Sequence, residues 1–130
     1  MSVRSANPTH FRDTLTVPSR IAYLCWRLCR LENPLEVRLK YGERIPLRPV
    51  PAEDYGAARE VFVDLNYENP RKTSRPVRRI VDLGANIGCS CLYWFREYPE
   101  CSVEAFEPHP VHLALLREDL RRNRLDGCTR

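Results

Sequence analysis

The sequence predicts an α/β protein in which a helix and a β-hairpin precede the first β-α-β-α part of a parallel sheet. Two short apolar runs, residues 79–83 and 101–106, carry this prediction, because each ends beside an acidic residue. Apolar residues recur every three or four positions after each run, which is typical of helices. Strands that are joined by a helix lie parallel in one sheet. We therefore expect residues 79–83 and 102–106 to form adjacent parallel strands, with a helix that begins near Ile87.

Composition limits the classes of protein to be considered. A length of 130 residues suits one domain, and 43% hydrophobic with 29% charged residues favours a folded, soluble chain. The net charge of +4 is low for a nucleic-acid-binding protein. No apolar stretch approaches the roughly 20 residues of a membrane span, and no signal-peptide pattern is present. The six cysteines lack the C-x-x-C spacing of a metal or redox site. We expect free thiols, no metal, no membrane contact and a cytoplasmic location.

The N-terminal part of the chain divides into a leader and a small structured region. Residues 1–20 lack periodicity, and we expect them to be a mobile leader. Residues 21–76 are expected to form a helix, a hairpin and a short helix. The hairpin pairs residues 35–39 with 45–47, and the short helix covers residues 52–63. The first helix has an expected buried stripe that comprises Ile21, Leu24, Cys25, Leu28 and Leu31.

Residues 77–130 are expected to form the front half of a parallel-sheet domain. The strand over 79–83 runs into Gly84-Ala85-Asn86-Ile87-Gly88, a sequence that predicts a tight turn. A helix follows the turn, and a second helix begins at Pro110, a residue suited to a first helical turn. The apolar stripes expected for these two helices are Ile87, Cys91, Phe95 and Tyr98, and then Leu113, Leu116 and Leu120.

Acidic residues stand at the carboxyl ends of both expected strands, where parallel sheets bind their ligands. Glu107 lies 25 residues after Asp82, a separation at which a β-α-β unit returns beside its first strand. A carboxylate at the end of the second strand can accept both hydroxyls of a ribose. Gly84 and Gly88 allow a tight turn and a close approach of backbone to ligand, and the amides of the turn are donors. The pattern predicts a site for an adenosine-type cofactor.

The turn does not match two common nucleotide-binding motifs. It lacks the G-x-G-x-x-G pattern of dinucleotide-binding proteins and the Gly-Lys-Ser/Thr ending of a P-loop. Asp82, which precedes the turn, would also repel a pyrophosphate. A cofactor with a positive ammonium and a sulfonium fits better, because this carboxylate and the neighbouring carbonyls can face those charges.

Two blocks of sequence carry a family resemblance. Val81-Asp82-Leu83-Gly84-Ala85-Asn86-Ile87-Gly88 and Ala105-Phe106-Glu107-Pro108-His109-Pro110 resemble the FkbM family of S-adenosylmethionine-dependent methyltransferases. The resemblance implies a class I methyltransferase (Rossmann-like) fold, of which this chain holds the N-terminal part. It also implies S-adenosylmethionine as cofactor and O-methylation of a small-molecule acceptor such as a sugar or polyketide. The cofactor-binding residues that it implies are Asp82, Gly84, Ala85, Asn86, Gly88 and Glu107.

Several alternatives stay open beside this interpretation. Asp82 could cap the following helix, Glu107 could be a solvated strand end, and the glycines could serve the turn alone. The many arginines leave a nucleic-acid methyltransferase as a second kind of enzyme. The chain could also be an inactive truncated fragment or a cofactor-binding module. Catalytic residues are expected beyond Arg130, so we expect the 130-residue chain by itself to transfer no methyl group.

Overall fold

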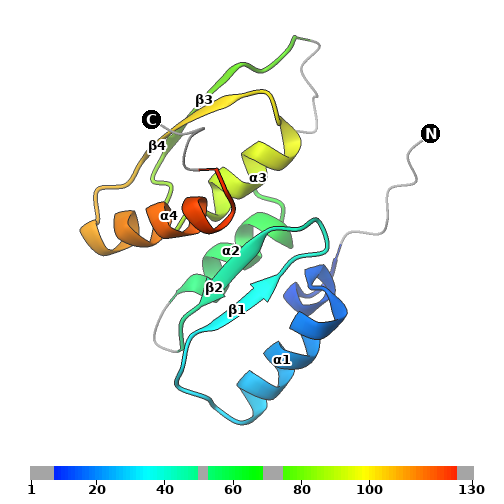
Figure 1. Ribbon diagram of the computed structural model, residues 1–130. Coiled ribbons are helices and arrows are strands. Elements are labelled where there is room, and N and C mark those ends of the chain that lie inside the picture. Colours follow the sequence, from blue (N-terminus) through cyan, green and yellow to red (C-terminus); the bar gives the residue numbers. More distant parts are fainter. Residues whose placement is uncertain (1–7, 50–52, 69–74, 126–130) are drawn as a thin grey trace, which may run out of the picture. The chain divides into compact units, whose positions relative to one another are not determined.

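The computed structural model describes residues 8–49, 53–68 and 75–125. The chain forms two compact units, Met1–Leu65 and Asn66–Arg130 (Figure 1). The boundary lies before the one expected after residue 76, because Tyr67 already belongs to the second unit. Its ring makes an edge-to-face contact with that of Trp94, with 5.4 Å between the centroids.

The first unit is built from a β-hairpin, a short 3-10 helix and two α-helices. In chain order these elements are η1 Phe11–Thr14, α1 Val17–Leu28, β1 Leu35–Arg38, β2 Arg44–Leu47 and α2 Asp54–Phe62. The strands pair antiparallel, with Leu35 opposite Leu47 and Val37 opposite Ile45, which confirms the predicted hairpin. Val37, Ile45 and Leu47 alternate with exposed or half-buried neighbours and are at most 1% exposed. Helix α1 packs on β1, and α2 packs on β2.

An aromatic cluster joins both helices of the first unit to η1. Phe11 makes edge-to-face contacts with Tyr23 of α1 and Tyr55 of α2, with ring centroids 5.8 and 5.6 Å apart. Tyr23 and Tyr55 stack on each other at 6.3 Å with an interplanar angle of 12°. Such ring pairs stabilise a fold beyond the apolar area that they bury. Phe11 is 1% exposed, so this cluster anchors the segment before α1 in the core.

The segment expected to be a mobile leader, residues 1–20, contains regular structure. It holds η1 and the first turn of α1, and Leu15 forms a β-bridge with Leu39. Residues 1–7 of the leader lie outside the described residues. Pro18 stands in the first turn of α1. The backbone N–H groups of a first turn have no partner within the helix, so a proline, which has no N–H, fits there. This proline therefore marks the start of a helix within the segment that was expected to be a mobile leader.

The apolar stripe expected to be buried on α1 is exposed, and that expectation is wrong. Ile21 is 60% and Leu28 is 82% exposed, whereas Tyr23 is 5% exposed. Cys25 and Cys29 are exposed as well. Helix α1 has apolar side chains on more than one face, and the ring contacts of Tyr23 decide which face is covered. Periodicity identified the helix but not the face that packs.

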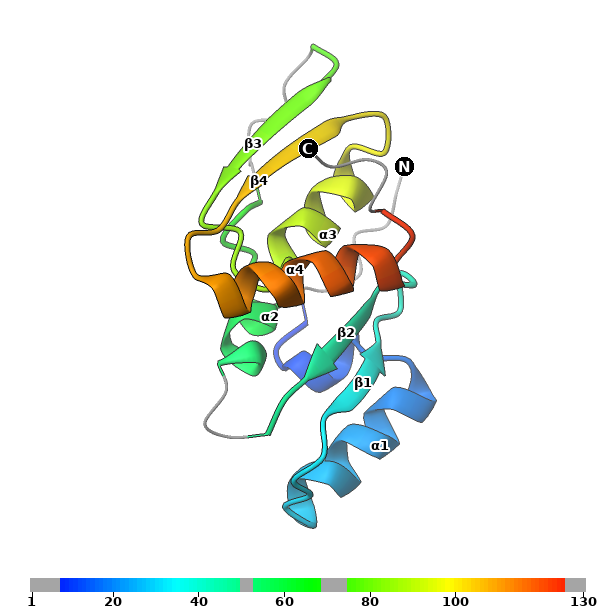
Figure 2. The same cartoon turned by 60° about the vertical axis from the view of Figure 1, so that its left-hand side comes forward.

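The second unit is a β-α-β-α arrangement. Its elements are β3 Arg79–Leu83, α3 Cys89–Glu97, β4 Ser102–Phe106 and α4 Pro110–Arg122. The two strands pair in parallel, from Arg79 opposite Ser102 to Leu83 opposite Phe106, as predicted. Both helices lie on the same side of the two strands (Figure 2). No helix within the described ranges combines the length and the apolar character that a membrane crossing requires.

One face of the β3–β4 pair packs on the helices, and the other face is exposed. The buried core of this unit comprises Ala85, Cys91, Phe95, Cys101, Val103, Leu116 and Leu120. It includes residues from both helical stripes predicted for this part of the chain. On the other face Val81, Leu83 and Phe106 are 53%, 79% and 53% exposed. Successive side chains of a strand point to opposite faces, so the helices can cover only every second residue.

A buried ion pair in the first unit should contribute measurably to stability. Asp54 is 3% exposed, and it accepts hydrogen bonds from the backbone N–H, Nε and Nη2 of Arg48 at 2.8, 2.8 and 2.6 Å. Replacing Asp54 with alanine leaves these donors without their acceptor. We expect the free energy of unfolding to fall by about 2 kcal/mol, because Arg48 is partly solvated and recovers some hydrogen bonds from water. Urea unfolding measures the change.

Asp64→Ala is the matched control for this variant. Asp64 also pairs with an arginine, Arg59, at 3.3 Å, but its side chain is 40% exposed. Its loss should change the free energy of unfolding by less than about 0.5 kcal/mol. Equal effects of the two variants would show that burial does not distinguish the pairs.

Candidate functional site

The chain turns tightly between β3 and α3. Gly84, Asn86 and Gly88 have positive φ angles of 87°, 50° and 101°. The amides of Gly84 and Ala85 both donate to the carbonyl of Phe106, at 2.8 and 3.0 Å, so the turn is fastened to the end of β4. Glycine adopts positive φ readily, and asparagine tolerates it better than most residues. The backbone shape alone therefore favours these residue types.

Glu107 connects the turn to the start of α4. Its Oε2 accepts the N–H of Asn86 and its Oε1 accepts the N–H of His109, both at 2.8 Å. The side chain is 8% exposed. The amide of His109, and then that of Asn86, lowers the pKa of Glu107 despite burial, because donors favour the charged carboxylate. Each carboxylate oxygen has two lone pairs, so each can accept one further hydrogen bond.

Asp82 lies beneath the turn and is 6% exposed. Its side chain faces α3, where the thiol of Cys91 donates to Oδ2 with 3.8 Å between sulfur and oxygen. Burial, and then the negative charge of Asp82, raises the pKa of Cys91 to about 12. The N-terminus of α3, at Cys89, also favours a negative charge nearby. Asp82 thus has a partner within the fold, in addition to its predicted role toward the cofactor.

The two glycines of the turn serve different purposes. A Cβ atom on Gly88 would lie 3.1 Å from Cδ1 of Leu116 and 3.8 Å from Cβ of Asp119, both in α4. Gly88 therefore permits α4 to pack against the turn. A Cβ atom on Gly84 would meet no atom within 4 Å. Gly84 is where the backbone is open to a ligand, a distinction that the sequence did not make.

A pair of histidines borders the same edge of the sheet, and sequence reasoning missed its second member. The rings of His109 and His112 have centroids 4.5 Å apart. Nδ1 of His112 lies 4.0 Å from Oε1 of Glu107. The separation of the two histidines by three residues could have predicted the pair, because residues three apart share a helix face. His109 itself is exposed.

The predicted cofactor-binding residues gather at the carboxyl edge of β3 and β4, at different depths. Gly84 is exposed and Asn86 and Glu107 are half-buried, whereas Asp82, Ala85 and Gly88 are buried. Within the described ranges, no three His, Cys, Asp or Glu side chains are arranged as ligands for a metal ion. The edge thus offers an open stretch of backbone and one carboxylate with remaining acceptor capacity. A polar ligand with several hydroxyl groups suits this set.

Sequence comparison relates this chain to a known methyltransferase, although no family model matches it. It is 42% identical over 69 residues to 31-O-demethyl-FK506 methyltransferase FkbM of Streptomyces tacrolimicus. The aligned part is 53% of this chain and 26% of that protein, so the chain spans about a quarter of the relative's length. The resemblance to FkbM-type methyltransferases is thereby confirmed for half of the chain.

Two solved structures share the fold. One is a putative transferase, PH0793 of Pyrococcus horikoshii, with a TM-score of 0.56 and 18% identity over 85% of this chain and 45% of that one. The other is TYW2 of P. horikoshii in complex with MeSAdo, with a TM-score of 0.50 and 18% identity over 87% and 46%. The predicted α/β arrangement of the class I methyltransferase type is confirmed.

Alanine substitutions at the two glycines should separate backbone strain from packing. Both positions have positive φ, so each alanine should cost about 1–2 kcal/mol of stability. At Gly88 the new methyl group also presses on Leu116, which should add roughly 1 kcal/mol or more. Denaturant unfolding of Gly84→Ala and Gly88→Ala measures the difference. Equal losses of unfolding free energy in the two variants would show that α4 shifts to accommodate the new methyl group at no energetic cost.

The lowered pKa of Glu107 makes a pH-dependent prediction. A carboxyl group whose pKa falls on folding stabilises the fold above its unfolded pKa, and this contribution disappears as pH falls through the folded pKa. The stability difference between the parent and Glu107→Gln should therefore be largest near neutral pH and should shrink below about pH 4. Thermal melts across this range test it. Glu100→Gln, at an exposed position, is the control, and a pH-independent difference at Glu107 would contradict the prediction.

Proposed function

We propose that this chain provides the S-adenosylmethionine-binding front part of a methyltransferase. One observation carries the proposal: the carboxylate of Glu107, at the end of β4, holds the amide of Asn86 in the glycine turn that follows β3. A ribose-binding acid and an amino-acid-binding turn are thereby joined at one sheet edge, where parallel sheets bind ligands. The FkbM relative is named a methyltransferase, and the TYW2 structure holds MeSAdo.

The residues at this edge fit the proposed cofactor. Gly84 leaves space beside the backbone, where a side chain would otherwise stand. Glu107 retains a lone pair on each oxygen for the two hydroxyls of a ribose. Asp82, buried beneath the turn, adds a negative charge that favours a ligand carrying a sulfonium and an ammonium.

S-adenosylmethionine supplies an activated methyl group, and the part played by this chain is to bind and orient the donor. A turn fixed by hydrogen bonds to β4 and to Glu107 changes little when a ligand arrives, so little of the binding energy is spent on ordering it. Such pre-ordering contributes to catalysis by holding the reacting groups in a productive geometry. Catalytic residues are not assigned to any position of this chain.

The proposed acceptor is a hydroxyl group of a small molecule, of the sugar or polyketide kind. The support comes from the name of the relative, which describes methylation of 31-O-demethyl-FK506. A cytoplasmic location accords with the reduced thiols of Cys25, Cys29 and Cys91. Neither assignment depends on the geometry of the turn.

Binding of the cofactor can be tested on this chain by NMR. We expect S-adenosylmethionine at millimolar concentration to shift the amide signals of residues 84–88 and 107–109 in a saturable way. Glu107→Ala should weaken that binding by roughly 10- to 100-fold, because hydrogen bonds to a charged group are lost. Glu104→Ala is the matched control, since Glu104 lies on the same strand but pairs with Arg79 on the exposed sheet face. Shifts confined to other regions, or equal effects of the two variants, would refute the site.

A further inference from the structure

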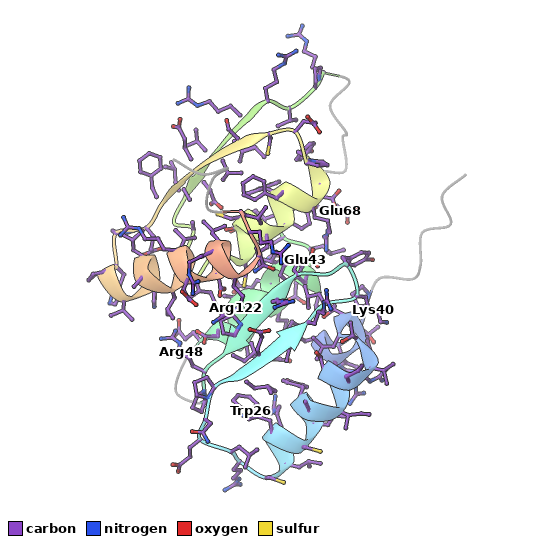
Figure 3. All side chains as sticks on the ribbon, viewed as in Figure 1. Trp26, Lys40, Glu43, Arg48, Glu68 and Arg122 are labelled. Carbon is purple, nitrogen blue, oxygen red and sulfur yellow. The ribbon has the colours of Figure 1, made fainter. Side chains whose placement is uncertain are left out.

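The first unit contains a cavity of about 680 Å³ that no part of the proposed function uses. It lies among the C-terminal half of α1, the chain that follows α1, the end of β2 and the start of α2. Its volume falls within the range of pockets that hold small molecules in proteins. Trp26 of α1 and Arg48 at the end of β2, which both line it, are labelled in Figure 3.

The walls of the cavity combine aromatic rings with positive charge. Tyr23, Trp26 and Tyr55 all line it, and Tyr23 stacks on Trp26 at 6.4 Å as well as on Tyr55. The guanidinium carbon of Arg27 lies 6.0 Å from the ring centre of Tyr23 and 5.7 Å from that of Tyr55. Nη1 of Arg27 also donates to the hydroxyl of Tyr23 at 3.2 Å. Arg27 is thus held against the rings that form the wall.

The charges around the cavity do not cancel. Arg27, Arg30 and Arg48 line it, and among the lining residues that the structure describes Glu32 is the one acid. Arg48 is committed to the buried carboxylate of Asp54 at 2.6 Å. Within the described ranges, no carboxylate lies within ion-pair distance of Arg27 or Arg30. The cavity therefore has an excess of positive charge, with donors available for an anion.

The backbone at Arg30 is unfavourable for an arginine. Two backbone hydrogen bonds close the end of helix α1. The amide of Arg30 donates to the carbonyl of Arg27 at 3.4 Å, and the amide of Leu31 donates to the carbonyl of Trp26 at 3.1 Å. In this type of helix end the residue at the position of Arg30 has positive φ and is usually glycine. Arg30 has a φ of 49°. A strained residue that lines a cavity suggests a role in binding.

We propose that this cavity binds a flat aromatic molecule that carries a carboxylate or a phosphate. The aromatic body would pack against the half-buried ring of Trp26, and the acid would meet the guanidinium groups of Arg27 and Arg30. A positive charge near the C-terminus of α1 also stabilises the helix, so the presence of arginines alone does not establish binding. Arg30 distinguishes helix stabilisation from ligand binding. Glycine suits the positive φ at this position better, so replacing Arg30 with glycine should weaken binding without destabilising the helix.

NMR of the indole N–H groups tests this proposal on the whole chain. The sequence has two tryptophans, and Trp94→Phe leaves Trp26 as the reporter in the cavity. The probes are 2-naphthoate, 2-naphthyl phosphate and the uncharged 2-naphthamide. We expect at least one of the two anions to shift the Trp26 signal saturably and to bind about tenfold more tightly than the amide. The better anion identifies the acidic group that the cavity prefers.

Arg30→Gly is the decisive variant. It should weaken binding of the better anion about tenfold while raising the melting temperature by about 3 °C, since glycine relieves the positive φ. Arg78→Gln, an exposed charge in the second unit, should change neither. Equal affinity for the amide and the anions would overturn the proposal. An unchanged anion affinity in Arg30→Gly would also overturn it. Because this variant is expected to be more stable than the parent, a loss of binding cannot be ascribed to unfolding.

Discussion

The structure of the second unit depends on one carboxylate that accepts two backbone amides. Glu107 fixes the turn after β3 through Asn86 and the start of α4 through His109. Both segments are short and irregular, and neither could satisfy these amides through regular secondary structure. The acid that the proposed cofactor would need therefore also holds the fold of this unit together. Its loss should disturb the site before any ligand is considered.

Several features could be predicted from the sequence because local patterns determine them. Two apolar runs beside acids indicated the parallel strands, and the glycines between them indicated the tight turn. The contact that Gly88 allows with Leu116 could not be predicted, because it depends on where α4 packs. The ion pair of Arg48 with Asp54 joins the end of a strand to a helix, and no periodic pattern in the sequence indicates it. The covered face of α1 was mistaken for the same reason: periodicity describes one element at a time, whereas burial is decided between elements.

Both units contain a cluster of aromatic rings, and they differ in their polar interactions. The first relies on stacked and edge-to-face rings around Phe11 and on a buried ion pair. The second also has a ring cluster, in which Trp94 contacts Tyr67, Tyr93 and Tyr98, and it packs apolar side chains between two strands and two helices. Its distinctive polar interactions are the hydrogen bonds concentrated in one turn. Rings and guanidinium groups in the first unit offer stacking and charge to a ligand. Backbone amides and a carboxylate in the second unit offer directional hydrogen bonds.

The environment of Cys91 has a consequence for the response to oxidants. The thiolate is the form of cysteine that oxidants attack, and a pKa of about 12 leaves Cys91 with almost none of it at neutral pH. Cys89 and Cys101 are buried in the same unit, whereas Cys25 and Cys29 are exposed on or next to α1. Among the cysteines that the structure describes, sulfenic acid formation or glutathionylation should therefore begin at α1. The turn that carries the proposed cofactor site should stay chemically unchanged under conditions that already modify the first unit.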